Sequence, residues 1–155
     1  MRLYLVQHGK AVDKQANSER PLSEDGIREA KAVAAWLSGK GLAIPEVWHS
    51  GKTRAQETAE LLAGRLAPDA KLHAQEGLDP NDDVEDLAQE LEERENDLMI
   101  AGHLPFLAKL ASRLLTGDED AESVTFTYAG VLCLERDSDD LWHVVWLVIP
   151  SLCTR

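Results

Sequence analysis

The sequence has no apolar run long enough to cross a bilayer, which argues against a protein built on membrane-spanning helices. Its start also fits a secretory signal peptide poorly, because the apolar run ends at Val6 and no small-residue cleavage site follows. We therefore expect a cytoplasmic protein with no membrane partner. At 155 residues the chain is long enough to bury a core, and residues 1–155 are expected to form one domain.

Cysteine is scarce. Cys133 and Cys153 lie in or beside apolar runs and far from each other in the chain, so their spacing suggests neither a metal-binding pair nor a disulfide framework. Two reduced, partly buried thiols are the expected outcome.

Positive charge is also scarce, with 16 Lys and Arg against 28 Asp and Glu and a net charge of -12. Nucleic acid and anionic membrane surfaces would repel such a chain, so we expect neither as a partner. A phosphate ligand would need a local pocket of positive charge that outweighs the negative electrostatic potential of the whole chain. The few basic residues near candidate catalytic groups are therefore informative.

Hydrophobic periodicity indicates strands that alternate with helices. A helix is expected after Ser23, which has the character of an N-cap, and it should end before Gly39. Pro105 is expected in the first turn of another helix. The expected strands are 2–7, 46–49, 71–74, 97–101, 130–135 and 142–149, and the other expected helices are 52–66, 84–94 and 104–115. The last two strands read as an antiparallel hairpin, so the pattern predicts an α/β fold: a mostly parallel mixed sheet between two helical layers.

Polar residues gather where three of these strands end, in residues 7–10, 50–54 and 102–105. Ligands of open α/β sheets bind beyond the carboxyl ends of the strands. His8 and His103 each stand beside a glycine at such an end, and Arg54 lies in the first turn of a helix whose free N–H groups favour anions. Two imidazoles, a guanidinium and a helix N-terminus suit the transfer of a phosphoryl group.

Each of these residues alone is a weak signal. A single histidine is most often a surface residue or a satisfied core residue, and this is our interpretation of His49, His73 and His143. His49 adjoins the site and could form a hydrogen bond within it, but we favour the plain interpretation. A metal site at His8 and His103 ranks well behind, since no His-x-His or Cys cluster lies nearby, and no metal or cofactor is expected.

Jointly, the segments resemble the histidine phosphatase superfamily. That family has Arg-His-Gly after the first strand, Ser-Pro-x-x-Arg-Ala-x-x-Thr-Ala after the second, and a later Gly-His. The matching segments here are 7–9, 50–59 and 102–103. The short chain, residues 20–26 and residues 103–105 are similar to the SixA-type phosphohistidine phosphatases within it. The resemblance spans nearly the whole chain and implies a phosphoglycerate mutase-like three-layer α/β/α sandwich.

The resemblance also implies roles. His8 would attack phosphorus and be phosphorylated transiently, with one ring nitrogen unprotonated and the other held by a hydrogen bond. Arg54 would bind phosphoryl oxygens, and His103 would donate to them as charge spreads. Arg20 either reaches the phosphate or fixes its loop through an ion pair. The remaining expected phosphate contacts are Gln7, Gly9, Lys10 and Ser50. The same pocket is expected to bind a phosphate or sulfate ion.

Two residues depart from the family pattern. Gln7 stands where the family has Arg, so a charged hydrogen bond worth about 1.5–3 kcal/mol becomes a neutral one worth about 1 kcal/mol. Lys10 either restores that charge or points into solvent. Gly51 replaces a proline, which we expect to loosen the turn with little effect on chemistry.

The resemblance favours phosphohistidine on a phosphotransfer (HPt-like) protein as the substrate. Larger members carry a Glu general acid for alkoxide leaving groups, whereas the corresponding stretch here offers only Glu76 and Asp79, which we expect to be solvated or to cap a helix. A protonated imidazole leaves without that help. Two alternatives stay open: a small-molecule phosphomonoesterase of the same fold, and a weakly active phosphate-binding module, because Gln7 replaces Arg.

Overall fold

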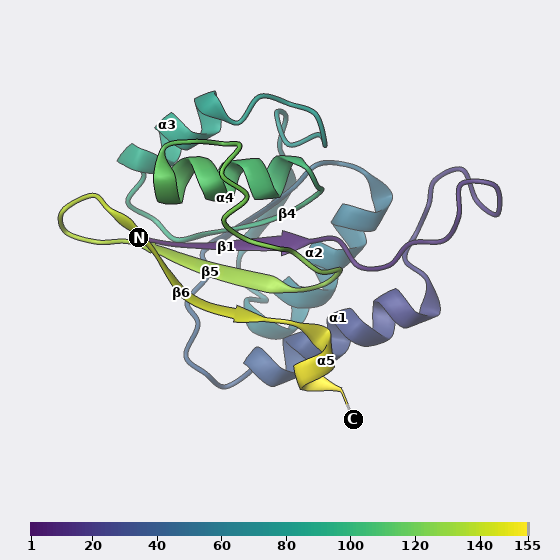
Figure 1. The fold of residues 1–155 in the computed structure, drawn as a ribbon. Coiled ribbons are helices and arrows are strands. Elements are labelled where there is room, and N and C mark those ends of the chain that lie inside the picture. Colours follow the sequence, from purple (N-terminus) through teal and green to yellow (C-terminus); the bar gives the residue numbers. More distant parts are fainter. Residues whose placement is uncertain (155) are drawn as a thin grey trace.

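The computed structural model describes residues 1–154 and contains a six-stranded mixed sheet with strand order β3-β2-β4-β1-β5-β6 (Figure 1). The strands are β1 (Arg2–Gln7), β2 (Glu46–His49), β3 (Lys71–Ala74), β4 (Leu98–Gly102), β5 (Val131–Arg136) and β6 (Trp142–Val148). The helices are α1 (Glu24–Leu37), α2 (Thr53–Leu66), α3 (Glu85–Glu93), α4 (Phe106–Thr116) and α5 (Pro150–Cys153). Strands β1 to β4 run parallel, and β5 and β6 are antiparallel, so the predicted fold class is confirmed.

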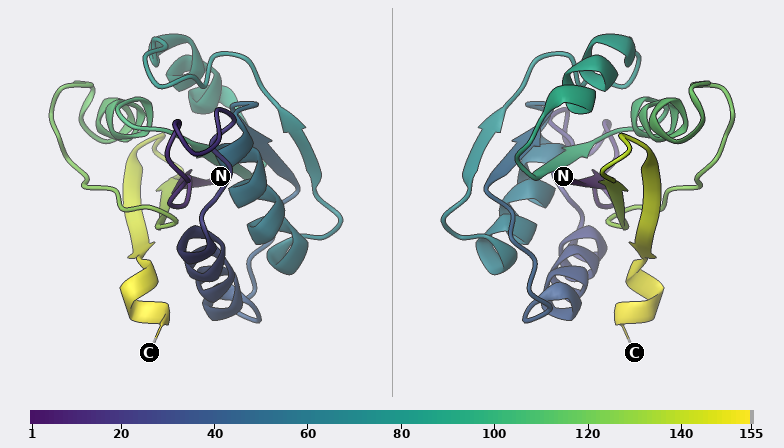
Figure 2. Two further views of the ribbon diagram at one scale, coloured as in Figure 1. Left: turned by 90° about the vertical axis from the view of Figure 1, so that its right-hand side faces the viewer. Right: turned by 90° about the vertical axis from the view of Figure 1, so that its left-hand side faces the viewer.

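The sheet separates two helical layers (Figures 1 and 2). Side chains of β1 point alternately to the two faces, as a strand requires. Leu3 and Leu5 join the core under α3 and α4, whereas Tyr4 and Val6 join the core under α1 and α2. All four are buried, which is typical of a parallel strand covered on both faces and explains its nearly unbroken apolar sequence. Within the described residues, no helix combines the length and apolarity needed to cross a membrane.

Strand register places the candidate residues side by side. Gln7 of β1 pairs with Gly102 of β4, so the residues that follow, His8 and His103, leave the sheet next to each other. His49 of β2 pairs with Ala101 of β4, which sets Ser50 beside the same end. Three segments remote in sequence therefore meet at one edge of the sheet.

The start of α1 is built as expected and braces the loop behind His8. Ser23 is the N-cap, and its side chain accepts a hydrogen bond from Gly26 N at 3.0 Å. A Cβ on Gly26 would lie only 2.1 Å from the carbonyl oxygen of Lys10. Only glycine lets the helix approach the loop so closely.

One expectation about the helices was wrong, and one helix was not predicted. The helix expected from Leu104 begins at Phe106, with Pro105 as its N-cap residue instead of in its first turn. The residue before a proline is disfavoured in the helical region, so Leu104 stays outside. The short helix α5 after β6 was not predicted, because four residues carry too little periodicity to be recognised.

Candidate active site

His8 is buried and its tautomer is set by the backbone. Its Nδ1 lies 2.7 Å from the carbonyl oxygen of Gly9, and only a protonated Nδ1 can bond to an acceptor of that kind. The Nε2 lone pair is thus free of a proton. Burial lowers the pKa of His8, as do the charges of Arg54 and Arg20, against the opposing effect of the Gly9 hydrogen bond. The lowered pKa favours the neutral form of His8, in which the unprotonated Nε2 faces Arg54.

Arg54 contacts that nitrogen. Its Nε donates to His8 Nε2 over 3.4 Å, and the residue lies in the first turn of α2, whose N-terminal N–H groups favour an anion. Thr58 ties the two elements together, because its hydroxyl oxygen accepts from Gly9 N at 2.9 Å and donates to the Arg54 carbonyl at 2.7 Å. Burial lowers the pKa of Arg54, as does the nearby charge of Arg20. The site therefore concentrates positive charge.

His103 lies beside His8, with ring centroids 5.0 Å apart and planes at 54°. Its Nε2 is 2.6 Å from the hydroxyl oxygen of Ser50, and its Nδ1 is buried with no hydrogen-bond partner among residues 1–154. Burial lowers the pKa of His103 to about 3, together with the electrostatic effect of the neighbouring His8 ring and the charges of Arg54, Lys52 and Arg20. A neutral imidazole donates a hydrogen bond through one nitrogen only. A phosphoryl oxygen bound in the site would supply a hydrogen-bond acceptor for His103.

The other residues expected to contact phosphate differ in their surroundings. Gln7 is 7% exposed, and its Oε1 has no hydrogen-bond partner within the described part of the chain. Arg20 donates from Nε to the carbonyl of Val12 at 3.2 Å, so it fixes its loop through this hydrogen bond, with no ion pair to residues 1–154. Its charge still acts on His8 and His103. Lys10 pairs with Glu29, with 2.9 Å between Nζ and Oε1. It is thus engaged by an acid and does not simply point into solvent.

The turn at Gly51 differs from the expectation. Its φ is +91°, which proline cannot adopt, so the backbone is re-routed and not merely loosened. His49 fixes this turn, because its Nδ1 accepts from Gly51 N at 3.1 Å, a bond that a proline could not make. The interpretation of His49 as a plain core residue is therefore incomplete, since it holds the turn that carries Ser50.

One residue at the site was not singled out from the sequence. The ring of Tyr128 lies 5.6 Å from the ring of His8, centroid to centroid. Tyr128 belongs to the irregular segment before β5, and no motif or period marks that segment. Its position depends on long-range contacts that the sequence does not display.

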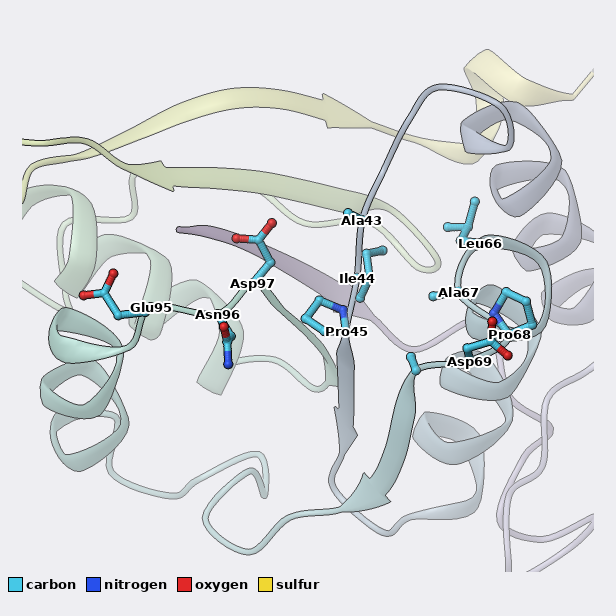
Figure 3. A pocket seen from close by; sticks show the side chains of 11 residues that line it. Ala43, Ile44, Pro45, Leu66, Ala67, Pro68, Asp69, Glu95, Asn96 and Asp97 are labelled. Atoms are coloured by element: carbon cyan, nitrogen blue, oxygen red, sulfur yellow. The ribbon is translucent and has the colours of Figure 1, made fainter.

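One cavity lies away from the candidate site. It has a volume of about 610 Å³ and lies at the amino ends of β2, β3 and β4 (Figure 3). His8, in contrast, follows the carboxyl end of β1. The walls of this cavity contain prolines, small apolar residues and three acids, and no histidine. A second cavity of about 560 Å³ adjoins the candidate site and is lined by Ser50 and residues 74–79. In that stretch Asp79 pairs with Lys52 over 3.9 Å.

The remaining candidates lie outside the site. His73 is exposed and lies 3.3 Å from Glu46, and His143 is exposed and lies 2.6 Å from Asp137. Both cysteines are free thiols, and burial raises the pKa of Cys133 to about 11. Over residues 1–154, no three His, Cys, Asp or Glu side chains gather in a way that could hold a metal ion.

Comparisons with known proteins identify relatives of this chain. The family model of the histidine phosphatase superfamily (branch 1) matches residues 3–99. Phosphohistidine phosphatase SixA of Escherichia coli K12 is 28% identical over 136 residues, which cover 84% of each chain. An uncharacterised protein of Picosynechococcus is 31% identical over 142 residues, with 86% of this chain and 84% of the relative covered.

Solved structures extend the likeness to the whole chain. The protein histidine phosphatase SixA complexed with tungstate superposes with a TM-score of 0.86 at 25% identity, over 99% of this chain and 100% of that one. The α-ribazole phosphatase of Shigella flexneri, at 18% identity, shares the fold with a TM-score of 0.77 over 97% of each chain. On its sequence, fold and arrangement of residues, this chain belongs to the histidine phosphatase superfamily.

Proposed function

We propose that this histidine phosphatase removes phosphate from phosphohistidine on a phosphotransfer (HPt-like) protein, through a phospho-His8 intermediate. The observation that carries the proposal is the orientation of His8. Its Nδ1 proton is held by the Gly9 carbonyl at 2.7 Å, which leaves an unprotonated Nε2 beside the Arg54 guanidinium. A buried, neutral and oriented imidazole next to a fixed cation is what a phosphoryl-accepting nucleophile needs.

The first step is an in-line attack by His8 Nε2 on phosphorus. A bond forms between Nε2 and phosphorus, and the bond between phosphorus and the substrate's imidazole nitrogen breaks. The leaving nitrogen keeps the electron pair and departs as neutral imidazole, because the other ring nitrogen of the substrate carries a proton. Arg54 and Arg20 offset the negative charge on the phosphoryl oxygens, and His103 donates one N–H to them.

Water completes the cycle. It forms a new bond to phosphorus, the bond to His8 Nε2 breaks, and orthophosphate leaves with neutral His8 restored. Two guanidinium groups and one imidazole N–H provide the charge stabilisation that a metal ion gives other phosphatases, so we propose that the reaction needs no metal. Tungstate in the related SixA structure is an oxyanion of the same kind.

The choice of phosphohistidine follows from the leaving group. An alkoxide needs a general acid, and Asp79 is paired with Lys52 instead of standing free for that task. An imidazole needs none. The likeness to the SixA protein, whose name states phosphohistidine as its substrate, supports the same choice.

A labelling experiment tests the proposal. A phosphotransfer domain phosphorylated on histidine with ³²P-phosphoramidate is mixed with the protein, and label on the enzyme is trapped by rapid alkaline quench. We expect transient label and release of orthophosphate, neither of them with His8→Ala, and both with His73→Ala as the matched control for an exposed histidine. Turnover resistant to EDTA tests metal independence.

The alternatives predict other results. Faster hydrolysis of sugar phosphates or p-nitrophenyl phosphate than of the phosphotransfer domain would indicate a small-molecule phosphomonoesterase. Binding of phosphate without label on His8 would indicate a phosphate-binding module. The buried Gln7 side chain, whose Oε1 has no partner among the described residues, is the feature that keeps this last alternative in view.

A further inference from the structure

Tyr128 is an aromatic residue held at the mouth of the site without serving the core. Its ring is tilted by 44° from that of His8 at a centroid separation of 5.6 Å, and 44% of the residue is exposed. Within residues 1–154 no hydrogen bond fixes its hydroxyl group. The ring therefore lies tilted beside the ring of His8, with a large apolar area left open.

The backbone under Tyr128 is fixed more firmly than that exposure suggests. The next residue, Ala129, has a φ of +59° and donates from its N–H to the Gln7 carbonyl at 2.9 Å. Gly130 N donates to the Thr127 carbonyl at 3.0 Å, which closes a tight turn around Tyr128. A left-handed non-glycine residue costs free energy and persists where its surroundings enforce it. The turn thus presents the ring at the end of β1.

One side of the Tyr128 ring borders a mainly apolar cavity. A cavity of about 220 Å³ lies against Tyr128 and is bordered by Thr127, Ile149 and Pro150. Lys10 and Glu29 also line it, but their ion pair at 2.9 Å neutralises both charges. This part of the rim therefore offers an apolar surface to a flat ring.

The same residue is close to the phosphoryl-binding cation. The phenol group of Tyr128 raises the pKa of Arg54, whereas burial lowers it. Because the Tyr128 ring lies 5.6 Å from the His8 ring, centroid to centroid, a phosphoryl group bound at His8 would have its leaving group within reach of the Tyr128 ring.

We infer that Tyr128 is a specificity-determining residue whose ring packs against the imidazole leaving group of phosphohistidine. This inference rests on the proposed function and deepens it. Aromatic rings pair favourably in offset or tilted arrangements at centroid distances of roughly 4.5–7 Å, and such pairs contribute a free energy equivalent to roughly two- to twelvefold in affinity. The site would thereby select P–N bonds to an aromatic ring over P–N bonds to ammonia.

Two substrates with the same scissile bond test the inference. Free phosphohistidine has an imidazole leaving group, whereas phosphoramidate has the same P–N bond and no ring. Values of kcat/KM for both are compared in the wild type, Tyr128→Phe and Tyr128→Ala. Trp36→Ala is the matched control, because Trp36 is also a half-exposed aromatic residue, 46% exposed, in the last turn of α1.

We expect Tyr128→Ala to lower kcat/KM for phosphohistidine by roughly two- to twelvefold through KM, and to leave phosphoramidate hydrolysis unchanged. Tyr128→Phe and Trp36→Ala should behave as wild type on both substrates. Equal losses on both substrates with Tyr128→Ala would overturn the inference in favour of a structural role. A loss with Tyr128→Phe as large as that with Tyr128→Ala would overturn it in favour of the hydroxyl group.

The failure of the proposed function is distinguishable from these outcomes. A wild-type protein that hydrolyses neither these two P–N substrates nor the histidine-phosphorylated phosphotransfer domain contradicts the proposed function, and the inference with it. A wild type that hydrolyses both, with no preference shifted by Tyr128→Ala, contradicts the inference alone.

Discussion

Replacing Gln7 by arginine tests how the site binds phosphate. Gln7 is the last residue of β1, directly before His8, and it is 7% exposed. Its Oε1 has no partner within the described residues, so the amide's acceptor contributes no hydrogen bond there. The nearby Lys10 ammonium is already paired with Glu29. The charge that the family carries at this position is therefore not supplied by Lys10.

The magnitude follows from the kind of hydrogen bond. A donor with full charge contributes about 1.5–3 kcal/mol to a bond with an anion, and a neutral amide about 1 kcal/mol. The difference of about 0.5–2 kcal/mol corresponds to a gain of roughly two- to thirtyfold in kcat/KM. The added cation also lies near Arg54 and Arg20. We therefore expect Gln7→Arg to lower the melting temperature in phosphate-free buffer and to recover it when orthophosphate binds.

The assay is steady-state release of orthophosphate from a histidine-phosphorylated phosphotransfer domain, with thermal melts in parallel. Gln7→Met is the control, because it keeps the length of the side chain and removes the amide. It should retain stability, since the buried acceptor had no partner to lose, while its kcat/KM falls. A Gln7→Arg protein that folds, binds orthophosphate and turns over no faster than wild type would refute the reasoning. That result would mean that the positive charge of the site is already sufficient.

Three further predictions concern stability. The pKa of His103 is lowered to about 3, below that of an unfolded histidine, so the native state binds fewer protons than the unfolded state. The free energy of unfolding should therefore fall as the pH drops from about 7 to about 5. Urea titrations should show a shallower fall of this free energy with pH for His103→Gln than for the wild type, and an equal fall would contradict the prediction. Gly51→Ala should lower the free energy of unfolding, measured by chemical denaturation, by roughly 1–2 kcal/mol because the φ of Gly51 is +91°. Gly51→Pro should lower it further, because it also removes the hydrogen bond to His49. Wild-type stability in both variants would contradict this description of the turn. Gly26→Ala should reduce both stability and kcat, because the new methyl group would displace the Lys10 carbonyl. Thermal melts and phosphate release measure the two effects. Wild-type values in both would rule out the close approach of α1 to the Lys10 carbonyl.

Much of the fold could be predicted from local pattern. Alternation of apolar runs with helical periods identified every strand, and Ser23 marked the start of α1 correctly. Prediction failed where local signals were short or ambiguous, as at Leu104 before its proline and at α5. The convergence of residues 7–10, 50–54 and 102–105 was also predictable, because parallel strands deliver their carboxyl ends to one edge of the sheet.

The details of the site depended on contacts between remote segments. The role of His49 requires a positive φ at Gly51, which the sequence permits but does not impose. The engagement of Lys10 requires α1 to bring Glu29 alongside it. Neither relation follows from spacing along the chain.

By itself, then, the sequence determined the order of the elements, the layered sheet and the residues that meet at its carboxyl edge, since these follow from periodicity and strand direction. Only the tertiary structure decided the protonated nitrogen of His8, the partner of Lys10 and the position of Tyr128. The reason is physical: periodicity records which face of an element is buried, whereas hydrogen bonds and charge pairs depend on distances of a few ångströms between segments that only packing brings together.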